Sequence, residues 1–407
     1  MLLFKKVLIP EGNEWCVRDV LIERGVFRRI SPPGELGVEN ISQSIDSVGK
    51  YLIPGFIDPH VHVREPGYSY KEDWDSCSRA ALKGGAVAIL DMPNNREPVV
   101  DVQSIHAKKD IALQKSYVNF GIYVALTDAN VETIKDAKVQ KLVCGVKIYL
   151  SKTTGNITVR SEVSLLNVFG QTKPVLVHTG GIAGLSKILS FYRKASVRFS
   201  RLPVLYICHT STEEEISLLR TWKMRFPEIH VEVSPHHLFL NRESYDGLQR
   251  VLPPLSSKSD SEALWRGIED GTVDLIGSDH APHTVAEKSS ATPPAGFPGL
   301  ETALPLMLDA VEERRITLET MLRVTSGCAK RLFQLGAGTG IREGEQANCT
   351  LFEKGRFTFG DDGYVTKCGW SPFDGRKHAY KPVFTVVNGC IGYDGKKMYR
   401  HRPRMIT

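Results

Sequence analysis

Two histidines one residue apart, His60 and His62, follow an apolar run at residues 52–57. In an extended strand, residues i and i+2 point to the same face, so both imidazoles can reach one cation from a single strand. Imidazole nitrogen is a common ligand of zinc and other transition metals. The spacing therefore indicates a metal site, although such a pair also occurs in proteins that bind no metal.

Four further polar residues stand at the ends of later apolar runs. They are Lys147 after 143–146, His178 after 175–177, His209 after 206–208 and Asp279 after 275–278. A single strand-end histidine is more often structural. In a parallel barrel, however, the carboxyl ends of all strands meet at one mouth, where active sites lie. We therefore expect these four residues to meet the histidine pair in one site.

Lys147 needs a separate explanation, because a protonated ammonium beside metal ions is repelled and cannot act as a ligand. Buried among cations, this lysine is expected to lose its proton. A neutral amine reacts with carbon dioxide to give a carbamate, and the anionic oxygens of an N6-carboxylated lysine can bridge two metals. The alternative is a lysine in an ion pair near a strand end.

The predicted centre is therefore binuclear. One ion is expected with His60, His62 and Asp279, the other with His178 and His209, and carboxylated Lys147 between them. Zinc suits this mixture of imidazole and oxygen ligands, and manganese or cobalt could replace it.

Short apolar runs alternate with amphipathic helical stretches from about residue 52 to residue 335. Examples are the runs 86–90, 143–150, 175–177, 204–208, 230–233 and 273–277, and the helical stretches 74–83 and 213–224. This alternation predicts an α/β fold with a parallel sheet, and the number of runs suits a (β/α)8 TIM-like barrel. An open doubly wound sheet is the alternative, but the chain has no GxGxxG or GxxxxGK[ST] phosphate loop.

Both ends of the chain are rich in β-type runs. These lie at 6–9, 16–22 and 26–30 near the start and at 382–387 and 390–393 near the end. Asn388-Gly389 and Asp394-Gly395 follow the last two runs and are strong hairpin signals. We predict a small β-sandwich domain formed by residues 1–52 and 343–407 together, and a barrel domain formed by residues 53–342.

Composition excludes several classes of protein. The chain has 407 residues, 42% of them hydrophobic, which is enough for a large core. Its net charge of +6 is spread along the sequence and forms no basic arm, so we expect no nucleic-acid partner. No signal-peptide pattern and no run near the ~20 apolar residues of a membrane span is present. Eight scattered cysteines without CxxC spacing complete the expectation of a cytoplasmic protein that does not bind membranes.

Five segments resemble dihydroorotases of the amidohydrolase superfamily. They are residues 55–67 (GFIDPHVHVREPG), 91–95 (DMPNN), 145–150 (GVKIYL), 278–283 (SDHAPH) and 296–302 (GFPGLET). The resemblance covers about 52–335, and the strings at 207–209 and 232–240 place it nearest the archaeal and animal-type enzymes. It implies reversible cyclisation of N-carbamoyl-L-aspartate to L-dihydroorotate, in de novo pyrimidine synthesis, by a zinc enzyme.

The residues make chemical sense of that reaction. Asp279 is placed to accept a proton from the attacking water and pass it to the leaving nitrogen. Arg64 projects from the same strand face as His60 and His62, and its planar fork matches a substrate carboxylate. The alternative for Arg64 is a surface ion pair.

The resemblance adds further substrate-binding residues to Arg64. They are Asn94 and His283, with backbone from Pro298 and Gly299 closing over the ring. Without the resemblance, Asn94 would be a turn former. The resemblance also associates Cys208 and Glu232 with a third zinc beside His60. The alternative is a buried thiol, with Glu232 orienting a histidine ligand.

Three departures from the family pattern qualify these roles. Leu252 and Ser256 stand where relatives often have polar residues around a Pro-Pro pair, so Arg250 could supply the missing hydrogen bond. Thr179-Gly180 replaces the usual Ala-Glu after His178. Residues 151–156, from Ser151 to Asn156, take the place of a mobile lid, where Thr153 or Thr154 could touch the ligand.

Two rival functions remain open. One is a sister cyclic amidase, such as a dihydropyrimidinase, hydantoinase or allantoinase, which shares the metals but not the carboxylate clamp. The other is a non-catalytic homologue that serves as an assembly partner, for example of aspartate transcarbamoylase. The resemblance also implies a homodimer.

Overall fold

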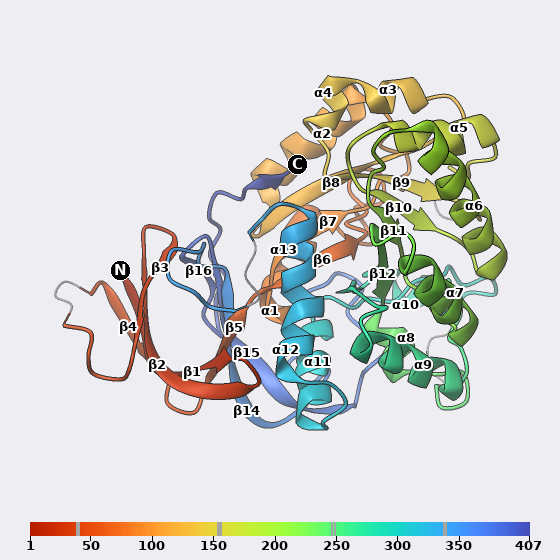
Figure 1. Cartoon of the computed structure of the whole chain (residues 1–407). Helices are drawn as coiled ribbons and strands as arrows, with labels where there is room; N and C mark the ends of the chain where they lie inside the picture. The colour runs from red at the N-terminus through yellow and green to blue at the C-terminus, as the bar shows by residue number, and fades with distance from the viewer. Residues whose placement is uncertain (38–40, 153–156, 246, 248–249, 337–339) are drawn as a thin grey trace.

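The computed structural model describes residues 1–37, 41–152, 157–245, 247, 250–336 and 340–407. Two sheets dominate it, a parallel barrel and a smaller mixed sheet that lies beside the barrel, at the left of Figure 1. Thr153 and Thr154 lie outside the described residues, as does the rest of 153–156.

The barrel consists of eight parallel strands in sequence order. They are β6 (Phe56–Val61), β7 (Ala86–Asp91), β8 (Asn119–Ala125), β9 (Gly145–Tyr149), β10 (Val175–His178), β11 (Leu205–Ile207), β12 (Ile229–Val233) and β13 (Leu275–Ile276). The chain after β13 returns to β6, because the His62 N–H donates to the His280 carbonyl at 2.8 Å. Most of these strands are buried along their whole length, as expected for parallel strands covered on both faces.

Helices follow the strands and cover the outside of the barrel (Figure 1). They are α1 (Trp74–Gly84), α2 (Val102–Lys115), α3 (Val131–Lys135), α4 (Ala137–Gln140), α5 (Glu162–Asn167), α6 (Ile182–Arg198), α7 (Glu213–Lys223), α8 (Pro235–Phe239), α9 (Lys258–Glu269), α10 (Val285–Lys288), α11 (Ala303–Glu312), α12 (Leu318–Leu322) and α13 (Cys328–Leu332). Local sequence sets their ends. Helix α1, for example, begins at a capping box between Asp73 and Ser76 and ends at Gly85, whose φ of 87° favours glycine.

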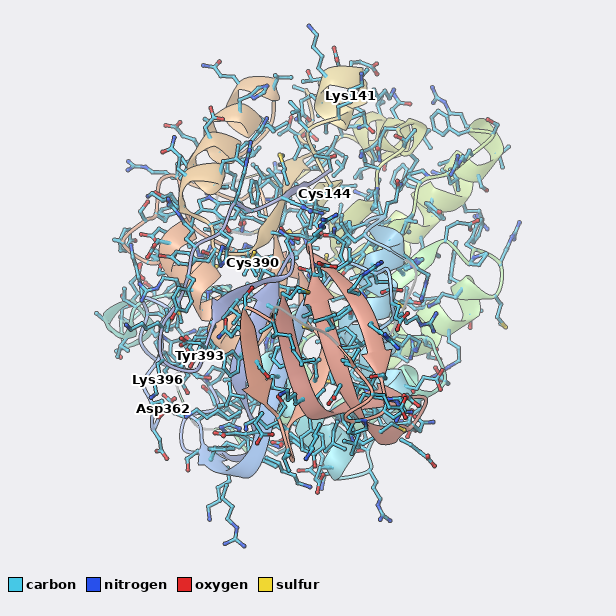
Figure 2. The ribbon with its side chains drawn as sticks, turned by 90° about the vertical axis from the view of Figure 1, so that its left-hand side faces the viewer. Lys141, Cys144, Asp362, Cys390, Tyr393 and Lys396 are labelled. Carbon is cyan, nitrogen blue, oxygen red and sulfur yellow. The ribbon has the colours of Figure 1, made fainter. Side chains whose placement is uncertain are left out.

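The smaller sheet joins both ends of the chain. Its strands are β1 (Leu2–Glu11), β2 (Glu14–Glu23), β3 (Val26–Ser31), β4 (Gln43–Asp46), β5 (Tyr51–Pro54), β14 (Cys349–Thr358), β15 (Lys377–Val387) and β16 (Cys390–Tyr393). Hydrogen bonds connect all eight in one mixed sheet, in which β5 pairs with both β1 and β14. Figure 2 shows this sheet toward the viewer, with the labelled Cys390 and Tyr393 on its edge strand β16.

The expected barrel and the contribution of both chain ends to a second sheet are confirmed. The turn at Asn388-Gly389 is also found between β15 and β16, with φ of 53° and 81°. Strand β8 was not among the runs named from the sequence. Strand β17 (Met405–Ile406) pairs with β8 of the barrel, so the last described strand leaves the smaller sheet. The division of the chain at residues 52 and 342 stays a prediction.

None of the helices formed by the described residues is both long enough and apolar enough to cross a bilayer.

Candidate metal centre and substrate pocket

The six residues expected to hold metal are buried at the carboxyl end of the barrel. His60 and Lys147 lie within β6 and β9, and His178 is the last residue of β10. His62 directly follows β6, and His209 and Asp279 lie two and three residues beyond the ends of β11 and β13. The last two have positive φ, 35° for His209 and 47° for Asp279, a backbone conformation that costs energy in residues other than glycine. Such strain often accompanies functional positions.

His60, His62 and Asp279 form the first group of converging ligand atoms. Oδ1 of Asp279 lies 3.1 Å from Nε2 of His62 and 3.3 Å from Nε2 of His60. Their ligand atoms all lie within 4.8 Å of one another, which is the arrangement of a metal-binding triad. Two imidazoles and a carboxylate suit zinc.

Glu232 and Cys208 form a second group with the other side of the His60 ring. The Nδ1 atom of His60 lies 2.9 Å from Oε1 of Glu232. Glu232 also accepts hydrogen bonds from the His209 backbone N–H at 2.9 Å and from the Tyr206 hydroxyl at 2.7 Å. With three partners already present, the carboxylate is placed to orient His60. Tyr206, which the sequence analysis missed, shares in this orientation.

His178 and His209 face one another beside Lys147. Nδ1 of His178 lies 2.8 Å from Nε2 of His209, and Nδ1 of His209 is buried without a hydrogen-bond partner. The Lys147 Nζ atom is fully buried and donates to the sulfur of Cys208 at 2.8 Å. None of the ion pairs among the described residues includes Lys147. A buried lysine without a carboxylate partner, beside unsatisfied imidazole nitrogen, fits a site that takes up cations.

The electrostatics keep most of these imidazoles neutral. Burial lowers the pKa of His62 to about 4 and that of His178 to about 3, and burial together with His178 places the pKa of His209 well below its ordinary value. His60 differs. Burial alone would lower its pKa, but Glu232 and Asp279 raise it to about 10. Since metal ligands must be deprotonated, the three neutral histidines are ready to bind an ion and His60 would lose a proton on binding.

Asp279 stays ionised in this surrounding. Burial alone would raise the pKa of its carboxyl group, but His60, His62 and His209 lower it well below the ordinary value. The carboxylate is therefore available as a ligand.

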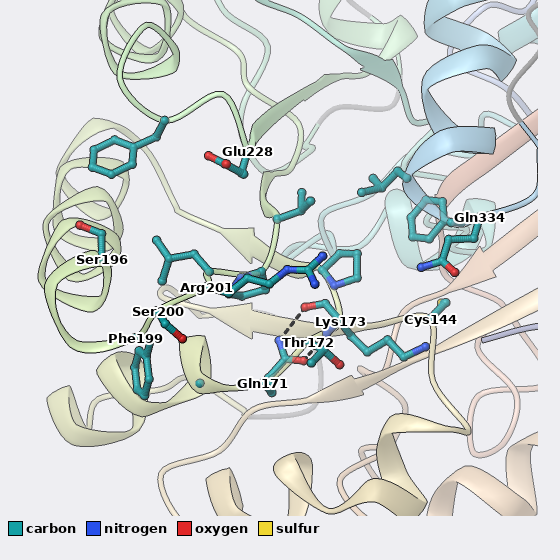
Figure 3. Close-up of a pocket in the computed structure, with 18 of the residues that line it drawn as sticks. Cys144, Gln171, Thr172, Lys173, Ser196, Phe199, Ser200, Arg201, Glu228 and Gln334 are labelled. Atoms are coloured by element: carbon teal, nitrogen blue, oxygen red, sulfur yellow. Dashed lines mark hydrogen bonds between the residues drawn. The ribbon is translucent and has the colours of Figure 1, made fainter.

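A cavity of about 370 Å³ opens onto this centre. Its lining combines the predicted site residues with loop residues: His60, His62, Arg64, Asn94, Lys147, Tyr149, Lys152, His178, His209, Arg250, Leu252, Asp279, Ala281, Thr292, Pro293, Pro294, Ala295 and Gly296. A larger cavity of about 760 Å³, shown in Figure 3, lies where the chain enters β9 to β12, at the opposite end of the barrel. It contains none of the predicted ligands.

Of the residues predicted to bind the substrate carboxylate, Arg64 and Asn94 line this cavity, whereas His283 contacts Arg64 and is not among the lining residues. Arg64 is buried, with φ of 69°, and its Nη2 donates to Nε2 of His283 at 3.2 Å. Its Nε is buried without a hydrogen-bond partner. Asn94 Oδ1 lies 2.7 Å from Nδ1 of His62. An arginine held open in this way is suited to receive a carboxylate.

Lys108 fixes the segments that carry His62, Arg64 and Asn94, which we call the inner wall (residues 62–66 and 91–95). The Lys108 Nζ atom is fully buried and lies 2.5 Å from Oδ2 of Asp91. It also donates to the Met92 carbonyl at 2.8 Å and to Asn95 Oδ1 at 2.7 Å. Asp91 in turn accepts from the Val63 N–H at 2.9 Å. One buried ammonium thus connects the ends of β6 and β7.

Pro298 and Gly299 do not line the cavity. The Gly299 N–H donates to Nδ1 of His280 at 3.1 Å, and both residues border a separate small pocket. Ala295 and Gly296 line the cavity there. The substrate-binding role of Pro298 and Gly299 stays a prediction.

Two of the departures from the family pattern have structural explanations. Gly180 has φ of 72°, and a Cβ atom there would lie 2.5 Å from Ser151 Oγ. Ser151 Oγ lies 2.9 Å from Nε2 of His178, so the missing glutamate makes room for a serine that contacts the histidine instead. Leu252 is 43% exposed and lines the cavity beside Arg250. Ser256 is not among the lining residues.

Residues 51–176 match the Amidohydrolase family. Dihydroorotase from Pyrococcus furiosus is 31% identical over 84% of this chain and 81% of its own length, and that from Pyrococcus horikoshii is 32% identical over 96% and 89%. The fold and the buried ligand cluster are those of an amidohydrolase. Within that class, the chain belongs to the dihydroorotase family.

Two other likenesses add to this assignment. Multifunctional protein pyr1-3 from Dictyostelium discoideum is 36% identical over 89% of the chain, which spans 16% of that protein. The chain likewise spans 16% of multifunctional protein CAD from Squalus acanthias, at 32% identity. Among solved structures, L-hydantoinase from Arthrobacter aurescens has a TM-score of 0.89 at 22% identity, covering 100% of this chain and 99% of that one. That likeness shows a shared fold.

Proposed function

We propose that this protein is a dihydroorotase, which interconverts L-dihydroorotate and N-carbamoyl-L-aspartate in pyrimidine synthesis. The observation that carries the proposal is the buried Arg64, whose guanidinium opens onto the same cavity as the cluster of metal-ligating side chains. A cyclic amide that carries a carboxylate fits this combination. An uncharged ring would leave a buried arginine without an anionic partner.

We assign the metal-holding roles to the six strand-end residues. His60, His62 and Asp279 would hold one zinc ion, His178 and His209 the other, and N6-carboxylated Lys147 would lie between them. When bound, the metals would lower the pKa of a water molecule and polarise the amide carbonyl. A third zinc at His60, Cys208 and Glu232 is the further possibility that their convergence supports. Against it stands the use of Glu232 as an acceptor for three other groups.

The chain's own residues would then move the proton and hold the substrate. In hydrolysis, water adds across the C–N bond of the ring. Asp279 accepts a proton from that water and delivers it to the ring nitrogen as the bond breaks. Cyclisation reverses these steps and releases water. Arg64 and Asn94 would bind the substrate carboxylate, with His283 holding the Arg64 guanidinium, and backbone of Ala295 and Gly296 would border the ring.

Assembly and location belong to the same proposal. Similarity to segments of two multifunctional proteins supports association with another activity, for which aspartate transcarbamoylase is our candidate. A homodimer and a cytoplasmic location follow from the family resemblance alone. We also propose that the chain divides into a small domain (1–52 and 343–407) and a barrel domain (53–342).

Metal content and dihydroorotate hydrolysis, measured on one preparation, test this function. Wild-type protein should hold two or three metal ions per chain and hydrolyse dihydroorotate, and Lys147→Ala should abolish that activity. Lys152→Ala, a change at another lysine of the same cavity, is the matched control and should retain the metal.

The other outcomes identify the rivals. Turnover of hydantoin or dihydrouracil without turnover of dihydroorotate would replace the proposal with a different cyclic amidase. Protein that binds no metal but assembles with aspartate transcarbamoylase would replace it with a non-catalytic partner.

A further inference from the structure

Lys288, the last residue of α10, is a second buried lysine beside the substrate pocket. Only 4% of its surface is exposed. Its Nζ donates to the carbonyl oxygens of Arg250 at 2.7 Å, Gly296 at 3.1 Å and Pro294 at 3.2 Å. Because an ammonium group has three hydrogens, these bonds use its full donor capacity.

The three carbonyls belong to two segments that form one side of the pocket, which we call the outer wall (residues 250–252 and 292–296). These segments contain almost no regular secondary structure. They contact each other directly, since the Gly296 N–H donates to the Arg250 carbonyl at 3.1 Å and Arg250 Nη1 donates to the Pro293 carbonyl at 3.0 Å. Lys288 binds both segments from behind.

The charge of Lys288 is stabilised without a carboxylate. None of the ion pairs among the described residues includes it. Its Nζ lies 5.0 Å from the ring centre of Phe297 and 5.8 Å from that of Trp370, within the range of cation–π contacts. An ammonium in this setting costs desolvation energy that a methionine would avoid. Packing alone therefore does not explain a lysine here, whereas anchoring of three carbonyls does.

Helix α10 is itself anchored to the side of the pocket that carries Arg64. Glu287, next to Lys288, lies 2.8 Å from Lys71 Nζ, and Lys71 Nζ lies 3.0 Å from Nδ1 of His283. His283 contacts Arg64 in turn. Lys288 therefore fixes the outer wall relative to the arginine that receives the substrate.

We propose that Lys288 is a positioning residue that sets the outer wall of the substrate pocket, and through it the fit of the substrate ring against Arg250, Ala295 and Gly296. Lys288 itself is not expected to touch the substrate. The inference rests on the proposed function for the identity of that substrate, but the placement of the wall does not depend on it.

The test compares Lys288→Met with Lys258→Met, which removes an exposed lysine of α9. Lys288→Met should raise the KM for dihydroorotate about tenfold and change kcat less than about threefold, because binding contacts are lost while the reacting groups stay in place. Metal content should not change. A KM equal to that of Lys258→Met would overturn the proposal, as would a loss confined to kcat.

Hydrogen exchange gives a readout that is independent of activity. Peptides covering 250–252 and 292–296 should exchange faster in Lys288→Met than in Lys258→Met, and unchanged exchange would overturn the proposal. If the wild type does not turn over dihydroorotate, the proposed function fails while this measurement still decides the role of Lys288. If Lys288→Met does not fold, Lys288→Gln, which keeps two donor hydrogens, provides the same comparison.

Discussion

The two walls of the substrate pocket are each held by a buried lysine, but in different ways. Lys108 binds the carboxylate of Asp91 as well as two oxygen acceptors, so the inner wall contains a neutralised ion pair. Lys288 binds three carbonyl groups and two ring faces, so the outer wall carries a net charge. The inner wall consists of Asp91 and the residues that directly follow strands β6 and β7, whereas the outer wall consists of loops between helices.

This difference separates two requirements of the site. Ligand atoms for metals must be placed within tenths of an ångström, which strand ends and a buried ion pair provide. Recognition of the substrate ring depends on loops that can vary among relatives without disturbing the metals. Leu252, where this chain departs from the family pattern, and Arg250, which could supply the missing hydrogen bond, both belong to the outer wall.

The largest expected effect is on the metal side of the pocket. Asp279→Asn keeps the shape of the side chain but removes the proton acceptor. We expect kcat for dihydroorotate to fall by about 10³-fold, within the range for loss of a general acid–base group. Steady-state assays of dihydroorotate hydrolysis will measure kcat and KM. Asp309→Asn, a change at a buried acid of α11, is the control, and a fall of less than about tenfold in Asp279→Asn would remove the catalytic role.

Lys108 and Lys288 should differ in what they contribute to stability. Lys108→Met leaves Asp91 buried without a cation, which should cost about 3–5 kcal/mol in the free energy of unfolding. Asp91→Asn combined with Lys108→Met removes both charges and should recover most of that loss. Urea unfolding of these variants, with the partly exposed Lys109 on the same helix changed to Met as the control, gives the values.

Lys288→Met should cost much less stability, because it leaves no carboxylate behind. Equal losses in Lys108→Met and Lys288→Met would contradict the distinction between the two walls.

The smallest expected effect is on the pH dependence of substrate binding. Burial, and next the charge of Arg250, lower the pKa of Lys288 to about 8. His283 and Arg250 are the charged or titratable groups that face it, with Cys368 behind Trp370. As pH rises through 8, the folded protein loses this proton and one hydrogen bond of the outer wall. The KM for dihydroorotate should then rise about threefold between pH 7 and pH 9, a binding loss of less than one hydrogen bond.

The free energy of unfolding should rise over the same pH range in which substrate binding weakens. Because the unfolded chain keeps the Lys288 proton up to its ordinary pKa of about 10.4, it binds more protons than the folded protein above pH 8, so the contribution of this group to stability rises there. Lys288→Arg, which stays protonated, should show neither change. A rise in KM that persists in Lys288→Arg would assign the effect to other groups.

The barrel and most of the cluster could be predicted because both depend on local patterns. Strands that are buried on both faces are continuous apolar runs, and the residues that end them, from His60 to Asp279, must meet where parallel strands end. Lys147 was placed in this cluster by the same rule, and its carboxylation, proposed because an ammonium does not fit such a cluster, stays a prediction. The hairpin at Asn388-Gly389 was found because few residues other than asparagine and glycine adopt positive φ.

The outer wall could not be predicted in the same way. Which of Ala295, Gly296, Pro298 and Gly299 face the cavity depends on how Lys288 and His280 hold the loop, and those contacts join residues far apart in the sequence. The exchange of a glutamate for Gly180 was noticed, but its partner Ser151 could be recognised only from the space that the glycine leaves. These loops have no periodic apolar pattern, so the sequence does not indicate which of their residues face the cavity.

The smaller sheet has a consequence for synthesis of the protein. Its strand β5 has β1 on one side and β14 on the other, and almost the whole barrel lies between β5 and β14 in the chain. During synthesis on the ribosome, the edge of β5 that includes Leu52 and Ile53 therefore stays unpaired until the barrel and then β14 have been made. Such edges invite pairing with other chains. Expression yield, and any need for chaperones, should accordingly depend more on this edge than on the metal centre.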